Sequence, residues 1–121
     1  MYADPSCKVF PSESIDPDDL KARQILRNAA LLIRTQGHTK YAQHDERGYC
    51  VHGALFMADI GITGVGLESH SRAGLMAVTR LTSYLKIPPM ITHRTTAVDW
   101  NNAPERQAYE VINALEAAAD V

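Results

Sequence analysis

Residues 15–37 read IDPDDLKARQILRNAALLIRTQG, and this stretch decides the fold. Its first residues are typical of the start of a helix, because Asp16 can accept hydrogen bonds from free backbone amides and Pro17 suits the first helical position. Apolar residues then recur at helical spacing on one face: Ala22, Ile25, Leu26, Ala29, Leu32 and Ile33. Gly37 follows the last polar turn as a natural residue just past a helix end. The stretch predicts one long amphipathic helix.

Two shorter helices are predicted downstream. Residues 50–60 are apolar almost all round and stop at Gly61, which is typical of a short buried helix. Residues 71–85 carry apolar side chains on one side, and Pro88-Pro89 ends that pattern. Between the first two helices, residues 38–49 lose the helical period. The type I turn signal of residues 45–48, DERG, is compatible with a short hairpin that pairs the region of Tyr41 with that of Tyr49.

The chain closes with a further helix. We expect a loop up to Trp100, and then a helix that begins with Asn102 as its cap, Pro104 in its first turn and Glu105 three positions after the cap. The four helix signals predict an all-α fold, with the short β-hairpin as an option between the first and second helices.

Length and composition predict one helical domain over residues 15–121, preceded by a mobile segment over residues 1–14. The chain has 121 residues, of which 45% are hydrophobic and 21% charged. No apolar run reaches the roughly 18–20 residues of a membrane span, and the N-terminus has no export signal. Two cysteines, Cys7 and Cys50, are too few for a disulfide scaffold. A net charge of −2 argues against a nucleic-acid binder.

Two stretches carry a family resemblance. Residues 49–55 read YCVHGAL, and residues 100–111 read WNNAPERQAYEV, the pattern W-N-N-x-P-x-R-x-x-x-E-V. Together with the first helix they resemble a family of short, uncharacterised proteins from actinobacteria and their bacteriophages. The resemblance covers about residues 20–119. It implies a bacterial or phage accessory protein that acts in the cytoplasm, or in the host cytoplasm if phage-encoded, and it transfers no catalytic residue.

Five residues are candidates for chemistry: His38, His44, Cys50, His52 and Asp59. The first four offer zinc-compatible donors, but their spacing matches no familiar zinc motif, so no metal site is assigned. A cysteine near a helix start is suited to be a thiolate nucleophile, with His52 as its base and Asp59 as the residue that orients the base. The apolar neighbours of Cys50 instead predict a packed, inert thiol.

The first helix also offers a candidate partner-binding surface. Arg23, Arg27 and Arg34 share its polar side, where Leu31 is the one apolar interruption. Such a stripe can grip an acidic partner, although a solvated face with an ion pair between Asp19 and Arg23 is the commoner arrangement.

The sequence also suggests three structural anchors and a resemblance to a DNA-binding motif. Trp100 is assigned as a structural anchor that packs a loop on the core, as an alternative to stacking on a ligand. Cys50 and Asn102 are the other assigned anchors. The stretch Ala54–Leu81 superficially resembles a helix-turn-helix, but its connection is too long and the chain is acidic.

Two function classes remain. No P-loop, dinucleotide fingerprint or hydrolase motif is present, so the sequence predicts no cofactor and does not favour an enzyme. The leading function is a non-enzymatic interaction protein whose helical surface contacts a host protein or a second copy of this chain. The alternative is a small-ligand- or metal-binding protein, including an enzyme, built around the five candidate residues.

Overall fold

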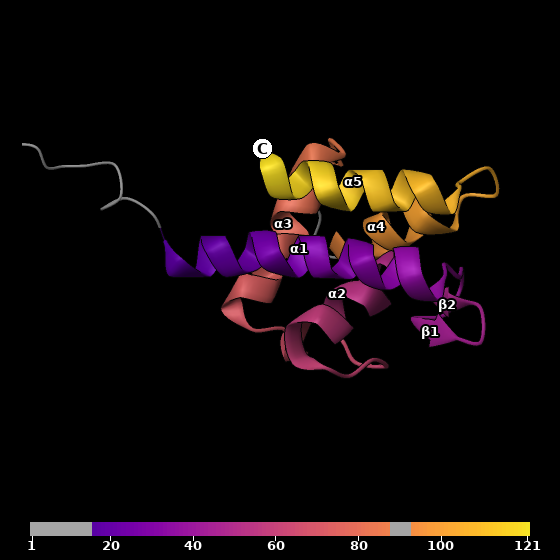
Figure 1. The fold of residues 1–121 in the computed structure, drawn as a ribbon, viewed down its shortest axis with the longest axis horizontal. Helices are drawn as coiled ribbons and strands as arrows, with labels where there is room; N and C mark the ends of the chain where they lie inside the picture. Colours follow the sequence, from indigo (N-terminus) through magenta and orange to yellow (C-terminus); the bar gives the residue numbers. More distant parts are fainter. Residues whose placement is uncertain (1–15, 88–92) are drawn as a thin grey trace, which may run out of the picture.

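The structure, a computed structural model, describes residues 16–87 and 93–121. It is mostly helical, with one small hairpin (Figure 1). Its elements, in chain order, are α1 (Pro17–Gln36), β1 (His44–Asp45), β2 (Gly48–Tyr49), α2 (Val51–Ile60), the 3-10 helix η3 (Leu67–Ser69), α3 (Arg72–Tyr84), α4 (His93–Asn102) and α5 (Ala108–Asp120). The predicted all-α class and the hairpin between the first two helices are confirmed. The segment 1–14, predicted to be mobile, lies outside the described residues.

Helix α1 is the centre of the fold. In Figure 1, α5 runs along one side of α1, and α2 lies on the other. The predicted helix start is confirmed, because Asp16 Oδ1 accepts a hydrogen bond of 2.8 Å from the backbone N–H of Asp18. The buried face of α1 contains Ala22, Ile25, Leu26, Ala29, Ala30 and Ile33. Ala30 thus joins the core, whereas Leu32, predicted on that face, is only partly buried.

The next two predicted helices are also confirmed. Cys50 is the N-cap of α2, and Gly61 ends that helix in a left-handed conformation with a φ of 78°. Ser71 caps α3 through its hydroxyl, which accepts a hydrogen bond of 3.1 Å from the N–H of Gly74. Pro88-Pro89 lies outside the described residues. None of the described helices combines the length and the apolar character that a membrane span requires.

The end of the chain differs from the prediction in two ways. The loop expected before Trp100 is wrong, because α4 occupies residues 93–102. Asn102 is the last residue of α4 and not the cap of the next helix, since α5 is capped by Gln107, whose N–H donates to Glu110 Oε1 at 2.8 Å. The N-x-P-E pattern of residues 102–105 does not start a helix, because residues 103–106 first form a turn. A 2.9 Å hydrogen bond from Arg106 N–H to Ala103 O closes that turn.

The hairpin crosses the end of α1 at two glycines. Its register pairs His44 with Tyr49, three residues beyond the Tyr41 region that the sequence suggested. At Gly37 an added Cβ would lie 2.1 Å from the carbonyl oxygen of Arg47, and at Gly48 it would lie 2.1 Å from the carbonyl of Gly37. Only glycine permits this approach, which places residues 38–43 beside the start of α2.

Candidate functional site

A cavity of about 390 Å³ opens where the loop after α1, the start of α2 and the end of α4 meet. We call it the α2–α4 cavity. It is lined by Tyr41, Ala42, Gln43, Cys50, His52, Val98 and Asn102. The cavity therefore joins side chains from both stretches that carry the family resemblance. Within the part of the chain that the structure describes, no carboxylate, lysine or arginine belongs to this lining.

Asn101 connects the elements that form the wall of this cavity, although it does not itself line the cavity. Its side chain is fully buried, and its Oδ1 accepts a hydrogen bond of 3.0 Å from the backbone N–H of Val51. Its Nδ2 donates to Thr39 O at 3.2 Å and to Asn102 Oδ1 at 3.0 Å. Because Oδ1 can only accept, His38 Nε2, which lies 2.8 Å away, carries a proton and donates it. One amide thus ties α4 to α2 and to the loop after α1.

The loop on the other side of the cavity is fixed by Gln43. Its side chain donates to Val65 O at 2.9 Å and accepts from the N–H of Gly64 at 2.8 Å. Its backbone carbonyl accepts a hydrogen bond of 3.1 Å from Cys50 N–H. An added Cβ at Gly53 would lie 1.8 Å from the same carbonyl oxygen. Glycine at position 53 is therefore what lets the loop lie against α2.

Cys50 is buried at the start of α2, with 5% of its surface exposed. Its Sγ accepts a 3.3 Å hydrogen bond from Gly53 N–H. Burial raises the pKa of the Cys50 thiol, and the backbone N–H groups of Gly53 and His52 oppose that rise without reversing it. The thiol is therefore neutral at neutral pH, unlike the thiolates of cysteine nucleophiles.

The predicted zinc donors do not assemble. His38 is bonded to Asn101, and the ring of His44 lies against that of Tyr49 with the centroids 4.3 Å apart. Only Cys50 and His52 share the α2–α4 cavity. Among the residues that the structure describes, no group of three or more histidine, cysteine or acidic side chains is placed to hold a metal ion.

Asp59 belongs to a second polar cluster, at the other end of α2. Its Oδ1 accepts from Ser71 Oγ at 2.6 Å, and its Oδ2 lies 2.8 Å from His70 Nδ1 and 2.9 Å from Ser71 N. Burial raises the pKa of the Asp59 carboxyl, but the hydrogen bonds from Ser71 and His70 together lower it below its usual range. The carboxylate assigned as the orienter of His52 is thus occupied by the start of α3.

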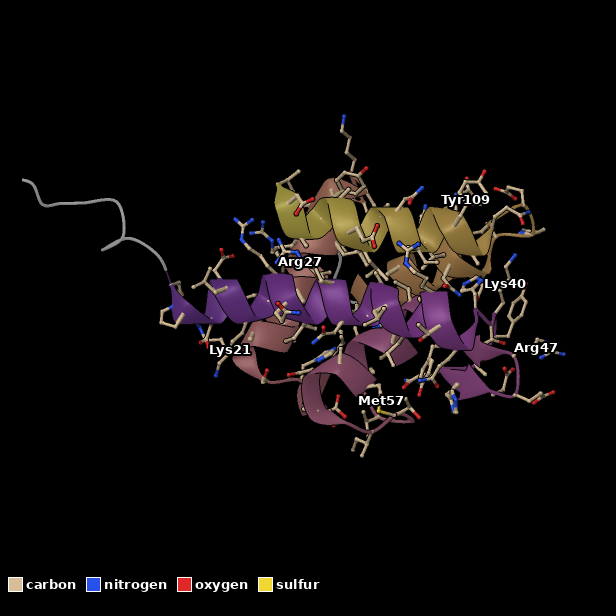
Figure 2. All side chains as sticks on the ribbon, in the orientation of Figure 1. Lys21, Arg27, Lys40, Arg47, Met57 and Tyr109 are labelled. Atoms are coloured by element: carbon tan, nitrogen blue, oxygen red, sulfur yellow. The ribbon has the colours of Figure 1, made fainter. Side chains whose placement is uncertain are left out.

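The arginine stripe of α1 faces α5, and Figure 2 shows Arg27 on that side. Each arginine bonds within the chain: Arg23 to Asp19 and to the carbonyl of Ala119, Arg27 to Asp120, and Arg34 to Glu116. Leu31 is 55% exposed on the same helix. The arginine charges are therefore paired internally, and a partner at this surface stays a prediction.

Trp100 lies on α4, where it is partly buried against the core. The guanidinium carbon of Arg106 sits 4.2 Å from the centre of its ring, and Arg106 Nε donates to Trp100 O at 2.9 Å. Glu110 Oε1 in turn lies 3.8 Å from Arg106. The W, R and E of the closing pattern are thus a chain of contacts that joins α4 to α5.

The superficial helix-turn-helix does not have that geometry. Residues 61–71, including η3, separate α2 from α3, which is longer than the turn of that motif. Arg72, at the start of α3, is paired with Asp16 and Asp18.

Sequence reasoning missed Tyr41, Gln43 and Asn101 as residues of the site. Asn101 had a usable signal, because it lies inside the W-N-N pattern beside residues that were singled out. Tyr41 and Gln43 had none, since they are loop residues that reach the cavity only through tertiary hydrogen bonds.

Comparison with known proteins places the chain in a family. No curated protein and no solved structure was found to match it. The model of DUF6197, a family of unknown function, matches residues 17–121. That range contains every described helix, the hairpin and the α2–α4 cavity. The chain therefore belongs to DUF6197, a family of unknown function.

Proposed function

We propose that this protein binds a small, uncharged molecule in the α2–α4 cavity and does not transform it. The observation that carries the proposal is the cavity of about 390 Å³, a size within the roughly 300–1,000 Å³ of small-molecule sites. Its wall combines apolar side chains with a few polar groups, which is the usual composition of such sites.

The lining indicates the charge of the ligand. Burying a charge without a partner is costly, and none of the described residues that line this cavity is a carboxylate, lysine or arginine. Asn102 offers a hydrogen-bond donor. Its Oδ1 already accepts from the N–H of Tyr41 and from Asn101, and its Nδ2 makes no hydrogen bond within the described part of the chain. A ligand with a carbonyl oxygen matches this donor.

Two features support binding rather than catalysis. The raised pKa of Cys50 keeps its thiol protonated, and a protonated thiol is a weak nucleophile. Asp59, the carboxylate expected to assist His52, is engaged by His70 and Ser71. In the actinobacterial or phage setting that the resemblance implies, we place this activity in the cytoplasm, as that of an accessory protein which carries or senses a small molecule.

The other function inferred from the sequence, contact with a host protein or a second copy through the stripe of α1, has less support. Its arginines are already paired with groups of the same chain. An acidic partner would have to break those pairs before it bound.

Saturation-transfer NMR with three probes tests the proposal. Benzamide and cyclohexanecarboxamide are uncharged carboxamides, and benzoate is a charged counterpart. Ala42→Phe places a ring in the cavity, and Ala108→Phe makes the same change at an exposed residue on the first turn of α5.

We expect both carboxamides to bind the wild type and Ala108→Phe but not Ala42→Phe. We also expect the wild type to bind the carboxamides more tightly than benzoate. Circular dichroism checks that both variants fold. Equal binding to Ala42→Phe, or no carboxamide binding to the wild type, would show that the cavity is not a ligand site.

A further inference from the structure

Tyr41 combines three features at the mouth of the α2–α4 cavity. Its backbone has a φ of 67°, a left-handed conformation that bulky residues rarely adopt. Its side chain is 80% exposed, and it lines the cavity. Lys86 also has a positive φ, but it does not line this cavity.

The conformation of Tyr41 is imposed by its neighbours and not by burial of its ring. Its N–H donates to Asn102 Oδ1 at 3.0 Å, and the ammonium of the preceding Lys40 donates to Ala103 O at 2.6 Å. Figure 2 shows Lys40 at the end of the molecule that carries the hairpin. The residues around the end of α4 thus hold the loop, while the exposed ring buries little apolar surface. The Tyr41 hydroxyl donates to the carbonyl of Asn102, but at 3.4 Å and at an exposed position this hydrogen bond contributes little to folding. Asparagine or glycine would fit this backbone better, so the cost of a tyrosine here points to a role beyond folding.

We propose that Tyr41 is the aromatic wall on which the ligand stacks, so that the ligand is a planar, uncharged aromatic or heteroaromatic molecule with a carbonyl group. This inference rests on the proposed function and names its ligand class. Stacking uses the exposed ring, and the carbonyl meets Asn102 Nδ2, whose own side-chain oxygen fixes the backbone of Tyr41. The hydrogen bond between Tyr41 and Asn102 therefore fixes the position of the aromatic ring relative to the Nδ2 donor.

The test compares dissociation constants for benzamide and cyclohexanecarboxamide, which share the carboxamide and differ in the planarity of the ring. We expect the wild type to bind benzamide about threefold to tenfold more tightly, the range for one aromatic pair. Tyr41→Phe keeps that preference. Tyr41→Asn loses it, while its thermal unfolding midpoint stays unchanged or rises, because asparagine accepts the left-handed backbone. Tyr109→Asn, at an exposed tyrosine on α5 (Figure 2), keeps the preference.

Three results would overturn the role of Tyr41: equal affinity of the wild type for the two carboxamides, a preference that survives Tyr41→Asn, or a clear fall in the unfolding midpoint of Tyr41→Asn. If both probes still bind in the cavity in those cases, the proposed function stands without Tyr41. If neither probe binds the wild type, both proposals fail together.

Discussion

Asn101 Oδ1 accepts a 3.0 Å hydrogen bond from the backbone N–H of Val51, 50 residues earlier in the chain. The first amides of a helix lack partners inside the helix, and this one is satisfied from α4. The amide of Gly53 is satisfied by Cys50 Sγ. The backbone N–H groups of Val51 and Gly53, at the start of α2, therefore already have partners within the chain. An anion bound at a helix N-terminus would need such groups to be available, so the arrangement agrees with an uncharged ligand.

Asn101→Ala is expected to lower the free energy of unfolding by about 3 kcal/mol. The substitution leaves the buried N–H of Val51 and the carbonyl of Thr39 without their partner, and each such loss costs about 1–3 kcal/mol. Urea denaturation measures the change. Asn102→Ala is the control, with an expected loss of about 1 kcal/mol, since its oxygen accepts from the exposed N–H of Tyr41 and from Asn101 Nδ2, which keeps its bond to Thr39 O. An equal loss in both variants would contradict the role given to Asn101.

Gly53→Ala tests the close approach of the loop to α2. Alanine favours a helix over glycine by about 1 kcal/mol, so an unobstructed site would be stabilised. Here the new Cβ would lie 1.8 Å from Gln43 O, and such overlap costs about 1–3 kcal/mol or more. We expect net destabilisation in urea denaturation, with a loss of carboxamide binding. A stabilised variant would show that the loop can move away freely.

Asp59→Asn is expected to remove part of the pH dependence of stability. The folded-state pKa of Asp59 lies below its usual range, so its contribution is present above the unfolded-state pKa and is lost as the pH falls through the folded-state pKa. The stability difference between wild type and Asp59→Asn should therefore shrink below about pH 4. Urea denaturation from pH 7 to pH 2 measures it. A difference that stays constant would mean that Asp59 is not stabilised as a carboxylate.

The parts of the fold that the sequence predicted are those with local causes. Asp16 and Pro17 start α1, and the apolar period marks its buried face. Helix α2 is marked by a run that is apolar almost all round and by Gly61 at its end, so both elements could be located without tertiary information. Helix α4 was missed because its sequence has no comparable signal. Asn102 resembled a helix cap in the sequence, but its side-chain oxygen accepts hydrogen bonds from Tyr41 N–H and from Asn101 Nδ2 instead.

The candidate site was predictable only in part. Cys50 and His52 were singled out from their residue types, and they do share the cavity. His38 was grouped with them as a metal donor, yet its ring is turned to Asn101. Residue type and spacing cannot show which partner a side chain meets across the fold, because that choice is made by packing of distant segments.

Thiol labelling tests the burial of Cys50. Its burial and raised pKa predict slow reaction with a thiol reagent at neutral pH until the protein unfolds. Cys7 lies outside the described residues, and its Pro- and Ser-flanked segment predicts fast labelling. Mass spectrometry after timed quenching separates the two sites. Labelling of Cys50 as fast as Cys7 would revive the nucleophile hypothesis.

Arg80→Ala is expected to destabilise the fold more than Arg34→Ala. The Arg80 side chain is only 18% exposed, and it links three helices: Nη1 bonds to Asp19 on α1 at 2.9 Å, and Nε bonds to Ala118 O on α5 at 3.1 Å. Its Nη2 also bonds to the carbonyl of Val121. Hydrogen bonds to charged groups contribute about 1.5–3 kcal/mol when partly buried, whereas an exposed pair such as Arg34 with Glu116 contributes about 0–1 kcal/mol.

The measurement for this pair of variants is urea denaturation at low and high salt. We expect Arg80→Ala to lose about 2 kcal/mol with little salt dependence, because a partly buried charge is weakly screened. Arg34→Ala should lose less than about 1 kcal/mol, and salt should erase that difference from the wild type. Arg80→Lys retains the charge without the planar fork, so it should fall between the wild type and Arg80→Ala. Equal losses for Arg80→Ala and Arg34→Ala would mean that the burial of Arg80 adds nothing to its contribution.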